Sequence, residues 1–283
     1  MNRYLFAIGL LLAGSFLWIG CSKPPEASVP EQTAAERFVV AGSGSNLPIT
    51  GKLAESYMQR GGIRIELPKS IGSSGAIKAV REGKIDLGLI SRPLKDSEKA
   101  EGIKQLSYAR IGIVLGVNRS VPDDNLTYQD LVEIFKGTKT SWQNGKMIVV
   151  LAREKGNSSN AVLAKEIPGF REALKESYVQ NRWQIYYTDA EEAHAIHDTP
   201  YSVGLTDTGS LSSLNLNIKP LQINGVPPSL ENVQNGKYKL AKDLYFIYKE
   251  PLAEWAKTFL EFVYSEEGQA IIAMNGGIPL KGK

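Results

Sequence analysis

The chain has 283 residues, 42% of them hydrophobic, and its 33 lysines and arginines nearly balance its 30 aspartates and glutamates. This composition excludes a collagen, a coiled coil and a wholly disordered chain, and the length suits one large domain or two ordinary ones. The formal net charge is only +3, and basic and acidic residues are interspersed along the chain, so no basic face for nucleic acid is expected. One cysteine excludes an internal disulfide and, with only two histidines, leaves little for a metal site.

The N-terminus has the pattern of a secretory signal. Arg3 precedes an uncharged apolar run from Tyr4 to Gly20, and the cysteine, Cys21, follows directly. The ending Trp18-Ile19-Gly20-Cys21 resembles the lipobox of bacterial lipoproteins, although Trp18 stands where leucine is usual. We predict a signal peptide over 1–20 and lipidation of Cys21. An uncleaved membrane anchor is the alternative, because a transmembrane helix needs roughly 20 apolar residues; in both cases the remainder lies outside the cytoplasm.

A tether follows the predicted lipidation site. Residues 22–36 contain three prolines, three glutamates and no aromatic side chain. Such a segment buries too little apolar surface to offset the entropy lost on folding. We interpret 21–36 as a flexible link between the lipid and a folded body that begins near Arg37.

The first part of the folded body repeats one unit of strand, hydroxyl-rich loop and helix. Strands are predicted over 37–41, 63–67 and 85–90 from apolar runs or alternation. Pro48 belongs in the first turn of the helix after the first loop, where a missing N–H costs nothing. The loops that close the three strands read Gly42-Ser43-Gly44-Ser45-Asn46, Ser70-Ile71-Gly72-Ser73-Ser74-Gly75 and Ser91-Arg92-Pro93. Strands alternating with helices predict an α/β fold with mostly parallel sheets.

The middle and end of the chain predict a second lobe. A strand over 146–152 is followed by a loop from Arg153 to Asn160 and a helix from about Ala161. A strand over 111–117 is expected to cross to this lobe and a strand over 244–248 to return. The last helix starts near Glu254 and is expected to continue through residues 265–269. We therefore expect lobe I over 37–117 with 243–283, lobe II over 118–242, and a hinged cleft between them.

The strand ends favour a site for a small anion. In open α/β sheets, ligands bind beyond the carboxyl ends of the strands. Helix N-termini there present free N–H groups and partial positive charge. Serine and glycine are also ordinary turn and N-cap residues, so one such loop alone indicates little. Three successive loops, with Arg153 at a further strand end, favour anion binding.

Five motifs, in their order and spacing, resemble the phosphate-binding proteins of bacterial ABC importers. The motifs are Gly42-Ser43-Gly44-Ser45-Asn46-Leu47-Pro48, Gly72-Ser73-Ser74-Gly75, Asp86-Leu87-Gly88 with Ser91-Arg92-Pro93-Leu94, Asn224-Gly225-Val226-Pro227-Pro228 with Gly236-Lys237-Tyr238, and Ser265-Glu266-Glu267-Gly268-Gln269. The resemblance covers roughly Phe38 to Leu280. It implies a two-lobed periplasmic-binding-protein fold of type II and a substrate-binding protein, expected to be a monomer. Such a protein captures phosphate or a similar tetrahedral oxyanion for permease subunits, without a cofactor or metal.

The resemblance also implies which residues hold the anion: loop hydroxyls, backbone N–H groups and one arginine. The matching positions are Ser45, Asn46, Ser73, Ser91, Arg153, Asn157, Ser158 and Ser159. The family's Ser-Gly-Thr falls on Asn157-Ser158-Ser159, and its next arginine falls on Asn160. Some relatives have an aspartate where this chain has Ser91. An ionised carboxylate only accepts hydrogen bonds, so it favours a protonated anion over sulfate. We therefore expect a pocket of donors alone, with weaker rejection of sulfate.

Several residues leave alternatives open. Arg92 is a candidate ligand or a surface partner of Asp86. His194 and His197 have a spacing that suits a metal, but a solvated helix turn is the favoured interpretation. A serine hydrolase needs Gly-x-Ser-x-Gly and a histidine base, and the window at 72–76 ends in Ala76. We expect no enzyme; an oxyanion sensor that feeds a signalling partner and an extracytoplasmic phosphoesterase are the alternative functions.

Overall fold

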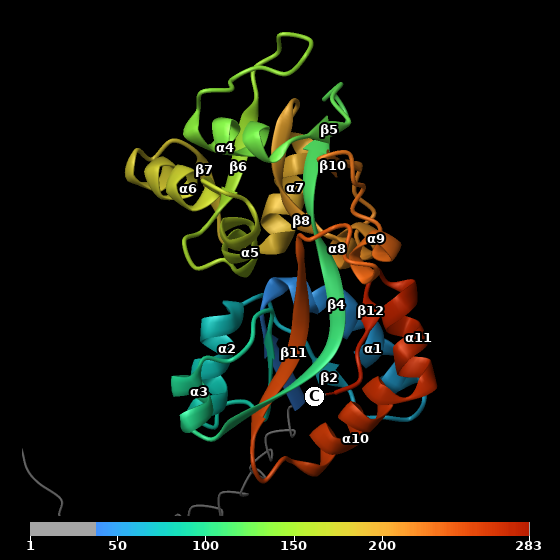
Figure 1. The fold of residues 1–283 in the computed structure, drawn as a ribbon. Helices are drawn as coiled ribbons and strands as arrows, with labels where there is room; N and C mark the ends of the chain where they lie inside the picture. The colour runs from blue at the N-terminus through green and yellow to red at the C-terminus, as the bar shows by residue number, and fades with distance from the viewer. Residues whose placement is uncertain (1–37, 283) are drawn as a thin grey trace, which may run out of the picture. The chain divides into compact units, whose positions relative to one another are not determined.

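Two long strands connect the two halves of the structure, a computed structural model that describes residues 38–282. They are β4 (Ile103–Asn118) and β11 (Ala241–Lys249), which pair antiparallel along the whole of β11. In Figure 1 they run side by side from the lower group of helices toward the upper group. From Ser107 to Val117 every residue of β4 except the exposed Arg110 is buried, as expected for a strand covered on both faces. The crossing strands predicted over 111–117 and 244–248 lie within this pair.

The lower half in Figure 1 combines the first part of the described chain with its end. Its elements are β1 (Phe38–Gly42), α1 (Leu47–Gln59), β2 (Ile65–Glu66), α2 (Gly72–Arg81), β3 (Leu87–Ile90), α3 (Asp96–Ala100), α10 (Glu254–Tyr264), α11 (Glu266–Met274) and β12 (Ile278–Pro279). β1 pairs parallel with both β2 and β3, and β3 pairs antiparallel with β11. Leu89 and Phe246 pack into the core beneath α1, α10 and α11. Their neighbours Ile90 and Ile247 face α2, so helices cover both faces of the sheet.

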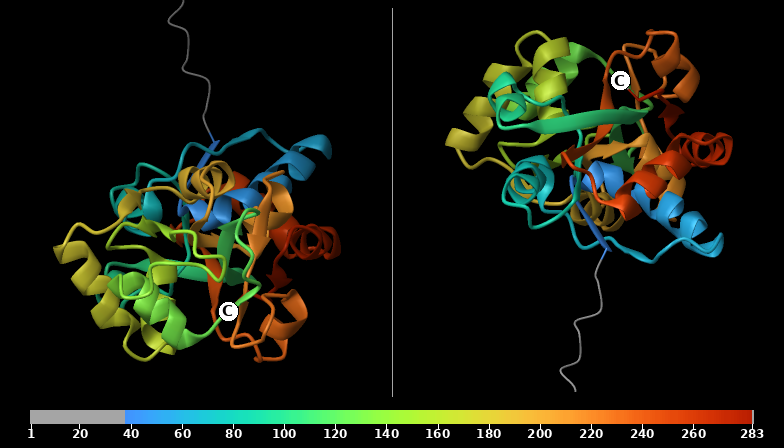
Figure 2. Two further views of the ribbon diagram at one scale, coloured as in Figure 1. Left: turned by 90° about the horizontal axis from the view of Figure 1, so that it is seen from above. Right: turned by 90° about the horizontal axis from the view of Figure 1, so that it is seen from below.

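The upper half repeats this layering with the middle of the chain. Its elements are β5 (Asn125–Leu126), α4 (Tyr128–Lys136), β6 (Val149–Arg153), α5 (Ser158–Glu166), α6 (Phe170–Val179), β7 (Gln184–Tyr186), α7 (Asp189–Asp198), β8 (Ser202–Asp207), α8 (Thr208–Ser213), β9 (Ile218–Pro220), β10 (Gln222–Ile223) and α9 (Leu230–Gln234). β6 pairs parallel with β7 and β8. Val150 packs against the core of α4 and α6, whereas Leu151 packs against Ala193 and Ile196 of α7. The predicted α/β architecture, with mostly parallel strands flanked by helices in each half, is confirmed (Figures 1 and 2).

β4 belongs to both halves of the sheet. It pairs with β11 from Ile103 to Gly112, and from Ile113 to Val117 it pairs antiparallel with β8. The strand order is therefore β2-β1-β3-β11-β4 on one side and β4-β8-β6-β7 on the other. Because the parallel strands of each half end near this shared element, the loops at their carboxyl ends face one another between the halves.

The structure corrects two predicted elements. The second strand pairs only over Ile65–Glu66, not over 63–67. The last helix does not continue through 265–269, because Ser265 is extended and its hydroxyl caps a new helix by accepting from the Gly268 N–H over 3.2 Å. A Cβ at position 268 would lie 2.2 Å from the Phe262 carbonyl oxygen, so only glycine allows this sharp turn between α10 and α11.

Within the described part of the chain, no helix is both long and apolar enough to cross a membrane. The predicted signal peptide, the tether and the lipidation site Cys21 lie outside the described residues.

Candidate anion-binding site

Three of the predicted loops meet through their serine hydroxyls. The Oγ atoms of Ser43 and Ser91 are 2.8 Å apart, and those of Ser91 and Ser158 are also 2.8 Å apart. The Ser73 hydroxyl accepts from the Ser91 N–H over 3.2 Å. These residues follow β1, β3 and β6 and begin α2, so the convergence expected from the strand ends is present in the structure.

Gly42 makes the close approach of the first two loops possible. A Cβ at position 42 would lie 2.0 Å from the carbonyl oxygen of Leu89 in β3. Only glycine therefore fits where β1 passes β3 at its carboxyl end. The chain then turns through a short 3₁₀ helix, Gly44–Asn46, before α1 begins.

Ser45 and Asn46 point in different directions from that turn. The buried Ser45 hydroxyl donates to Oδ1 of Asp189 over 2.9 Å and faces the other half of the molecule. The Asn46 amide donates to the carbonyl of Ile90 and to the hydroxyl of Tyr108, which belong to the lower half. Asn46 thus holds the turn against the sheet of the lower half, and its side chain does not contact the hydroxyls of Ser43, Ser91 and Ser158.

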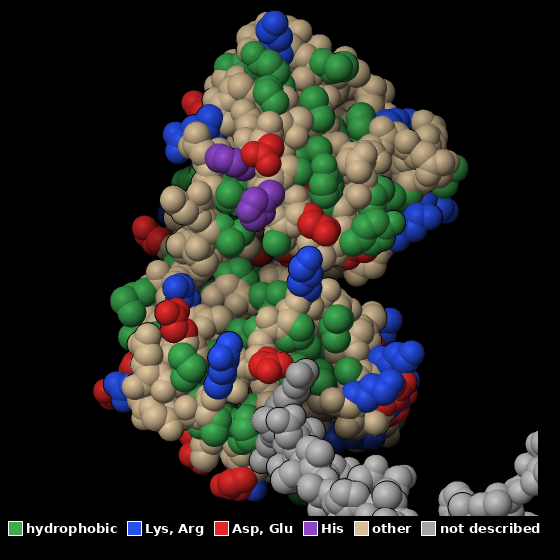
Figure 3. Space-filling view, turned by 180° about the vertical axis from the view of Figure 1, so that it is seen from behind, with side chains coloured by type: hydrophobic (Ala, Val, Ile, Leu, Met, Phe, Trp, Pro, Cys, Tyr) green, Lys and Arg blue, Asp and Glu red, His purple; other side chains and the backbone are tan. Residues whose placement is uncertain are grey.

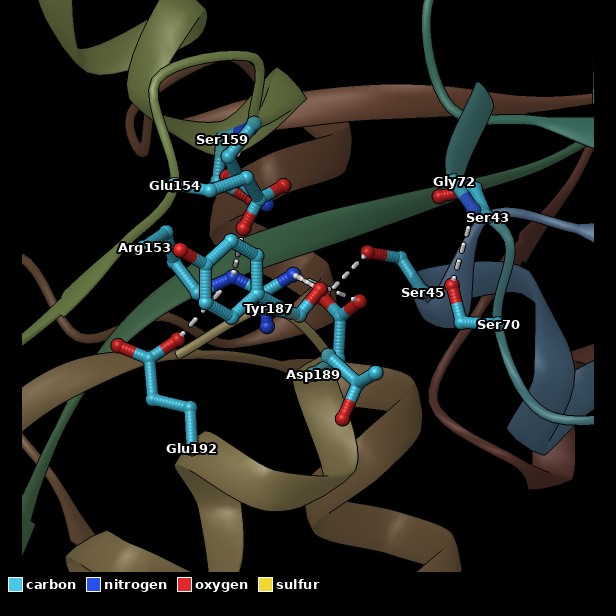
Figure 4. Close-up of polar contacts among 12 residues, drawn as sticks. Ser43, Ser45, Ser70, Gly72, Arg153, Glu154, Ser159, Tyr187, Asp189 and Glu192 are labelled. Atoms are coloured by element: carbon cyan, nitrogen blue, oxygen red, sulfur yellow. Dashed lines mark hydrogen bonds and ion pairs between the residues drawn. The ribbon is translucent and has the colours of Figure 1, made fainter. Parts of the chain in front are cut away.

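Arg153 ends β6 and is enclosed by carboxylates, as Figure 4 shows. Only 4% of the residue is exposed. Its Nε lies 3.3 Å from Glu154 and 3.6 Å from Glu192, and its Nη2 lies 3.4 Å from Asp189. Burial opposes the charge, but these carboxylates outweigh it and raise the pKa of Arg153. Within residues 38–282 its buried Nη1 and Nε have no hydrogen-bond partner, so these N–H groups of the guanidinium are available to a ligand.

Asp189 is a carboxylate at the site that the sequence analysis missed. It stands at the N-terminus of α7, where its Oδ1 accepts from Ser45 and its Oδ2 faces Arg153. A Cβ at Gly44 would lie 2.2 Å from Oδ2, so the turn and the carboxylate pack closely. The expected pocket of donors alone is therefore wrong. The available signal was a capping box, Thr188 with Glu191, after a strand at 184–186 that was not predicted.

Two more carboxylates lie fully buried behind the site. Glu192 accepts from the Leu205 N–H over 2.8 Å, and burial raises its pKa to about 8 although Arg153 opposes the shift. Asp207 caps α8 by accepting from the Ser210 N–H over 2.8 Å. Burial raises its pKa to about 6, against the nearby charge of Lys242.

Lys242 of β11 is a second buried cation that the sequence analysis missed. Its residue is 5% exposed, and its Nζ donates to Ser45 and Ser159 over 2.8 Å each and to Ser158 over 3.2 Å. Burial lowers the pKa of this lysine. The predicted strand over 244–248 begins three residues earlier in the structure, and this extension brings Lys242 between the halves.

The remaining loop residues serve the local structure. The side chain of Asn157 caps α5 by accepting from the N–H groups of Ser159 and Asn160. Arg92 makes a bidentate pair with Glu98, with both distances 2.8 Å, and its hydrogen bonds lower the pKa of Glu98 to about 2. The alternative of a pair with Asp86 is wrong.

The two histidines lie on the upper half of the face shown in Figure 3. His194 bonds the carbonyl of Ala190 in its own helix, and His197 accepts from the Asn217 N–H. Among residues 38–282, no three histidine, cysteine, aspartate or glutamate side chains are grouped for a metal ion.

A cavity of about 240 Å³ opens between the loops of the two halves. Its walls include Ser43, Ser73, Arg92, Arg153, Glu154, Ser158, Tyr187 and Asp189. A larger groove of about 820 Å³ adjoins it and shares Gly44, Ser70 and Asp189. Figure 3 shows the hollow between the upper and lower halves on the histidine-bearing face. Polar groups from both halves thus surround a space large enough for a small anion.

Comparison with known proteins identifies the family. The family model described as the PBP superfamily domain matches residues 27–267. The phosphate-binding protein PstS 2 of Streptococcus agalactiae is 31% identical over 114 residues, which are 40% of this chain and 39% of that protein, so this match spans well under half of the relative. The phosphate-binding protein PstS of Bacillus subtilis is 24% identical over 260 residues, 88% of this chain and 83% of that protein.

A solved structure supports the same assignment. It is described as a phosphate ABC transporter substrate-binding protein with bound phosphate, from Clostridium perfringens. It superposes with a TM-score of 0.76 at 29% identity and covers 87% of this chain and 100% of that chain. The two-lobed arrangement, the two crossing strands and the match over most of the sequence all support the same family. This chain belongs to the PBP superfamily, with the fold of its phosphate-binding members.

Proposed function

We propose that this chain is the substrate-binding component of an ABC importer and captures inorganic phosphate, or a similar tetrahedral oxyanion, between its two halves. One observation carries the proposal: serine hydroxyls from three strand ends converge beside a buried arginine whose Nη1 has no partner in the described residues. Hydroxyl donors and a guanidinium suit a compact oxyanion. The names of the related proteins favour phosphate.

The proposed ligands are side chains from both halves. They are Ser43, Ser73 and Ser91 from the lower half, with Arg153, Ser158 and Ser159 from the upper half, while Asn46 and Asn157 hold their turns in place. The N-terminus of α5 adds partial positive charge, while the Ser159 and Asn160 N–H groups are already bound by the Asn157 cap. Ser45, expected to be a ligand, instead donates to Asp189 and accepts from Lys242, so in this proposal it holds these two charged groups in place beside the ligand.

Asp189 gives the proposed site a means to recognise a proton on the ligand. Phosphate near neutral pH carries at least one hydroxyl, whereas sulfate carries none. A carboxylate accepts a hydrogen bond from that hydroxyl and repels a fully ionised anion. We therefore infer that the site prefers phosphate to sulfate, which reverses the expectation drawn from the Ser91 position.

The lobes and the anchor complete the proposal. Lobe I spans 37–117 with 243–283 and lobe II spans 118–242, with β4 and β11 as the shared crossing segments. Cys21 carries lipid, residues 21–36 form the tether, and the folded body works outside the cytoplasm as a monomer that docks on permease subunits. A binding role rather than catalysis agrees with a family of binding proteins.

Isothermal titration calorimetry with phosphate, sulfate, molybdate and a small carboxylate tests this function on residues 37–283. We expect heat from phosphate and little from the carboxylate. If no tetrahedral oxyanion binds, the proposal is wrong. Turnover of a chromogenic phosphate ester would instead favour a phosphoesterase.

A further inference from the structure

We propose that Lys242 makes the site selective for anions, because it supplies a positive charge with no ion-pair partner within 4.0 Å in the described residues and leaves the protons of the Ser158 and Ser159 hydroxyls free to donate. This inference rests on the proposed function and adds a ligand-binding role for a residue of the crossing strand β11. Three structural observations support it.

The first is the charge balance of the site. Three carboxylates lie within 4 Å of the Arg153 guanidinium: Glu154, Asp189 and Glu192. Even with Glu192 protonated, Glu154 and Asp189 compensate the charge of Arg153 before any ligand arrives. Lys242, by contrast, forms no ion pair within 4.0 Å among residues 38–282: its Nζ donates to serine hydroxyls, and Asp189 and Asp207 act on it from a greater distance. A buried cation without an ion-pair partner in direct contact is costly, and an anion held between the halves would lower that cost.

The second is the direction of the hydrogen bonds. An ammonium group only donates, so each hydroxyl that contacts Nζ must accept with its oxygen and keep its own proton free to donate elsewhere. Ser159 then has an O–H to offer. Ser158 can donate onward to Ser91, and Ser91 to Ser43, over 2.8 Å each. The chain of donors that starts at Lys242 thus ends at Ser43, which lines the 240 Å³ cavity.

The third is the position of Lys242 between the halves. Its ammonium touches Ser45 of the first turn and Ser158 and Ser159 at the start of α5. A group on the crossing strand therefore contacts the anion-binding loops of both halves at once. Binding of an anion at these hydroxyls adds an attraction that holds the two halves together around the ligand.

The test compares phosphate binding to variants by calorimetry at one ionic strength. Lys242→Met keeps the length of the side chain but removes the charge and the donors, and we expect at least a tenfold loss of phosphate affinity. Lys242→Gln keeps a donor without the charge and is expected to lose affinity as well. Lys242→Arg keeps the charge and is expected to bind more tightly than either. Lys239→Met, at an exposed position three residues earlier, changes the net charge equally and should bind within about twofold of wild type.

Thermal unfolding without ligand separates binding from folding. If Lys242 were only structural, Lys242→Met would lower the melting temperature; we expect it unchanged or raised, since apolar replacement of a buried charge is often stabilising. Wild-type affinity in Lys242→Met or in Lys242→Gln overturns the inference while the proposed function stands. Absence of oxyanion binding by wild type itself overturns the proposed function, and the inference with it.

Discussion

Ser45 donates its hydroxyl proton to Asp189 over 2.9 Å, across the space between the two halves of the protein. The serine belongs to the turn after β1, and the carboxylate starts α7, 144 residues later in the chain. The same carboxylate lies 3.4 Å from the Arg153 guanidinium. An acceptor therefore lies among the donors of the site.

Asp189→Asn should weaken discrimination between phosphate and sulfate. The amide can donate to a fully ionised anion, and the repulsion by the carboxylate is lost. We expect the phosphate-to-sulfate affinity ratio to fall about tenfold, the equivalent of about 1.4 kcal/mol. Calorimetry with both anions measures the ratio. Asp198→Asn, at the exposed end of the same helix, is the control, and an unchanged ratio in Asp189→Asn would exclude Asp189 as the discriminating group.

Arg153→Ala should weaken both binding and folding. Loss of a charged partner from a desolvated contact costs about 2–5 kcal/mol, so phosphate affinity should fall at least tenfold. The variant also removes the cation that Glu154 and Asp189 pair with, which should lower the free energy of unfolding in urea. Arg92→Ala serves as the comparison, since its guanidinium is already paired with Glu98. Equal affinity of Arg153→Ala and wild type, measured by calorimetry, would remove Arg153 from the site.

Stability should decrease as the pH rises from about 4.5 to about 8. Burial raises the pKa of Glu192 from 4.5 to about 8, so in this window the folded state holds a proton that the unfolded state has released. Folding is then favoured at the acidic end and loses this contribution as the pH approaches the folded pKa. Asp207 acts in the same direction up to about pH 6.

Urea unfolding at pH 5, 6.5 and 8 measures this effect in the absence of ligand. Glu192→Gln cannot titrate, so the decrease in unfolding free energy from pH 5 to pH 8 should be smaller than in wild type. Glu191→Gln, at an exposed position on the same helix, controls for the change in net charge. Parallel pH profiles for wild type and Glu192→Gln would show that this carboxyl does not bind the proton.

Gly268→Ala and Gly51→Ala should change stability in opposite directions. A Cβ at 268 would lie 2.2 Å from the Phe262 carbonyl oxygen, so α10 and α11 would have to move apart, and we expect a loss of at least about 1 kcal/mol. A Cβ at 51 meets only Leu67, at 3.9 Å, inside α1. There alanine should stabilise by about 0.5–1 kcal/mol. Differential scanning calorimetry compares the two; a stable Gly268→Ala would contradict the close approach.

Cys21→Ser should abolish lipid attachment, because a hydroxyl does not replace the thiol that accepts the lipid. Two or more acyl chains give stable membrane binding, whereas one chain gives only marginal binding. Fractionation of cells should show the variant released from membranes or retained there as an unprocessed precursor. Normal processing and membrane attachment of Cys21→Ser would disprove the lipoprotein interpretation.

Local patterns in the sequence located the parallel strands of the lower half, both crossing strands and β6, but not β7 or β8 of the upper half. Apolar runs and alternation located β1, β3, β6 and both crossing strands, because each of these strands is buried and its side chains face the core. The serine- and glycine-rich loops located the edge of the sheet where the site lies. The short extent of β2 and the break at Ser265 were missed, because strand pairing and helix capping depend on contacts with other elements.

The sequence by itself determined the architecture and the serine and arginine donors, since strand ends and helix starts are local features that place those residues on one edge. Only the tertiary structure decided the charges around them. Asp189, Glu192 and Lys242 come from elements 36 to 89 residues beyond Arg153, and no local pattern relates them. Packing of the elements buries these groups and removes water from around them. Their protonation and their hydrogen-bond partners therefore depend on residues that are near in space, not in sequence.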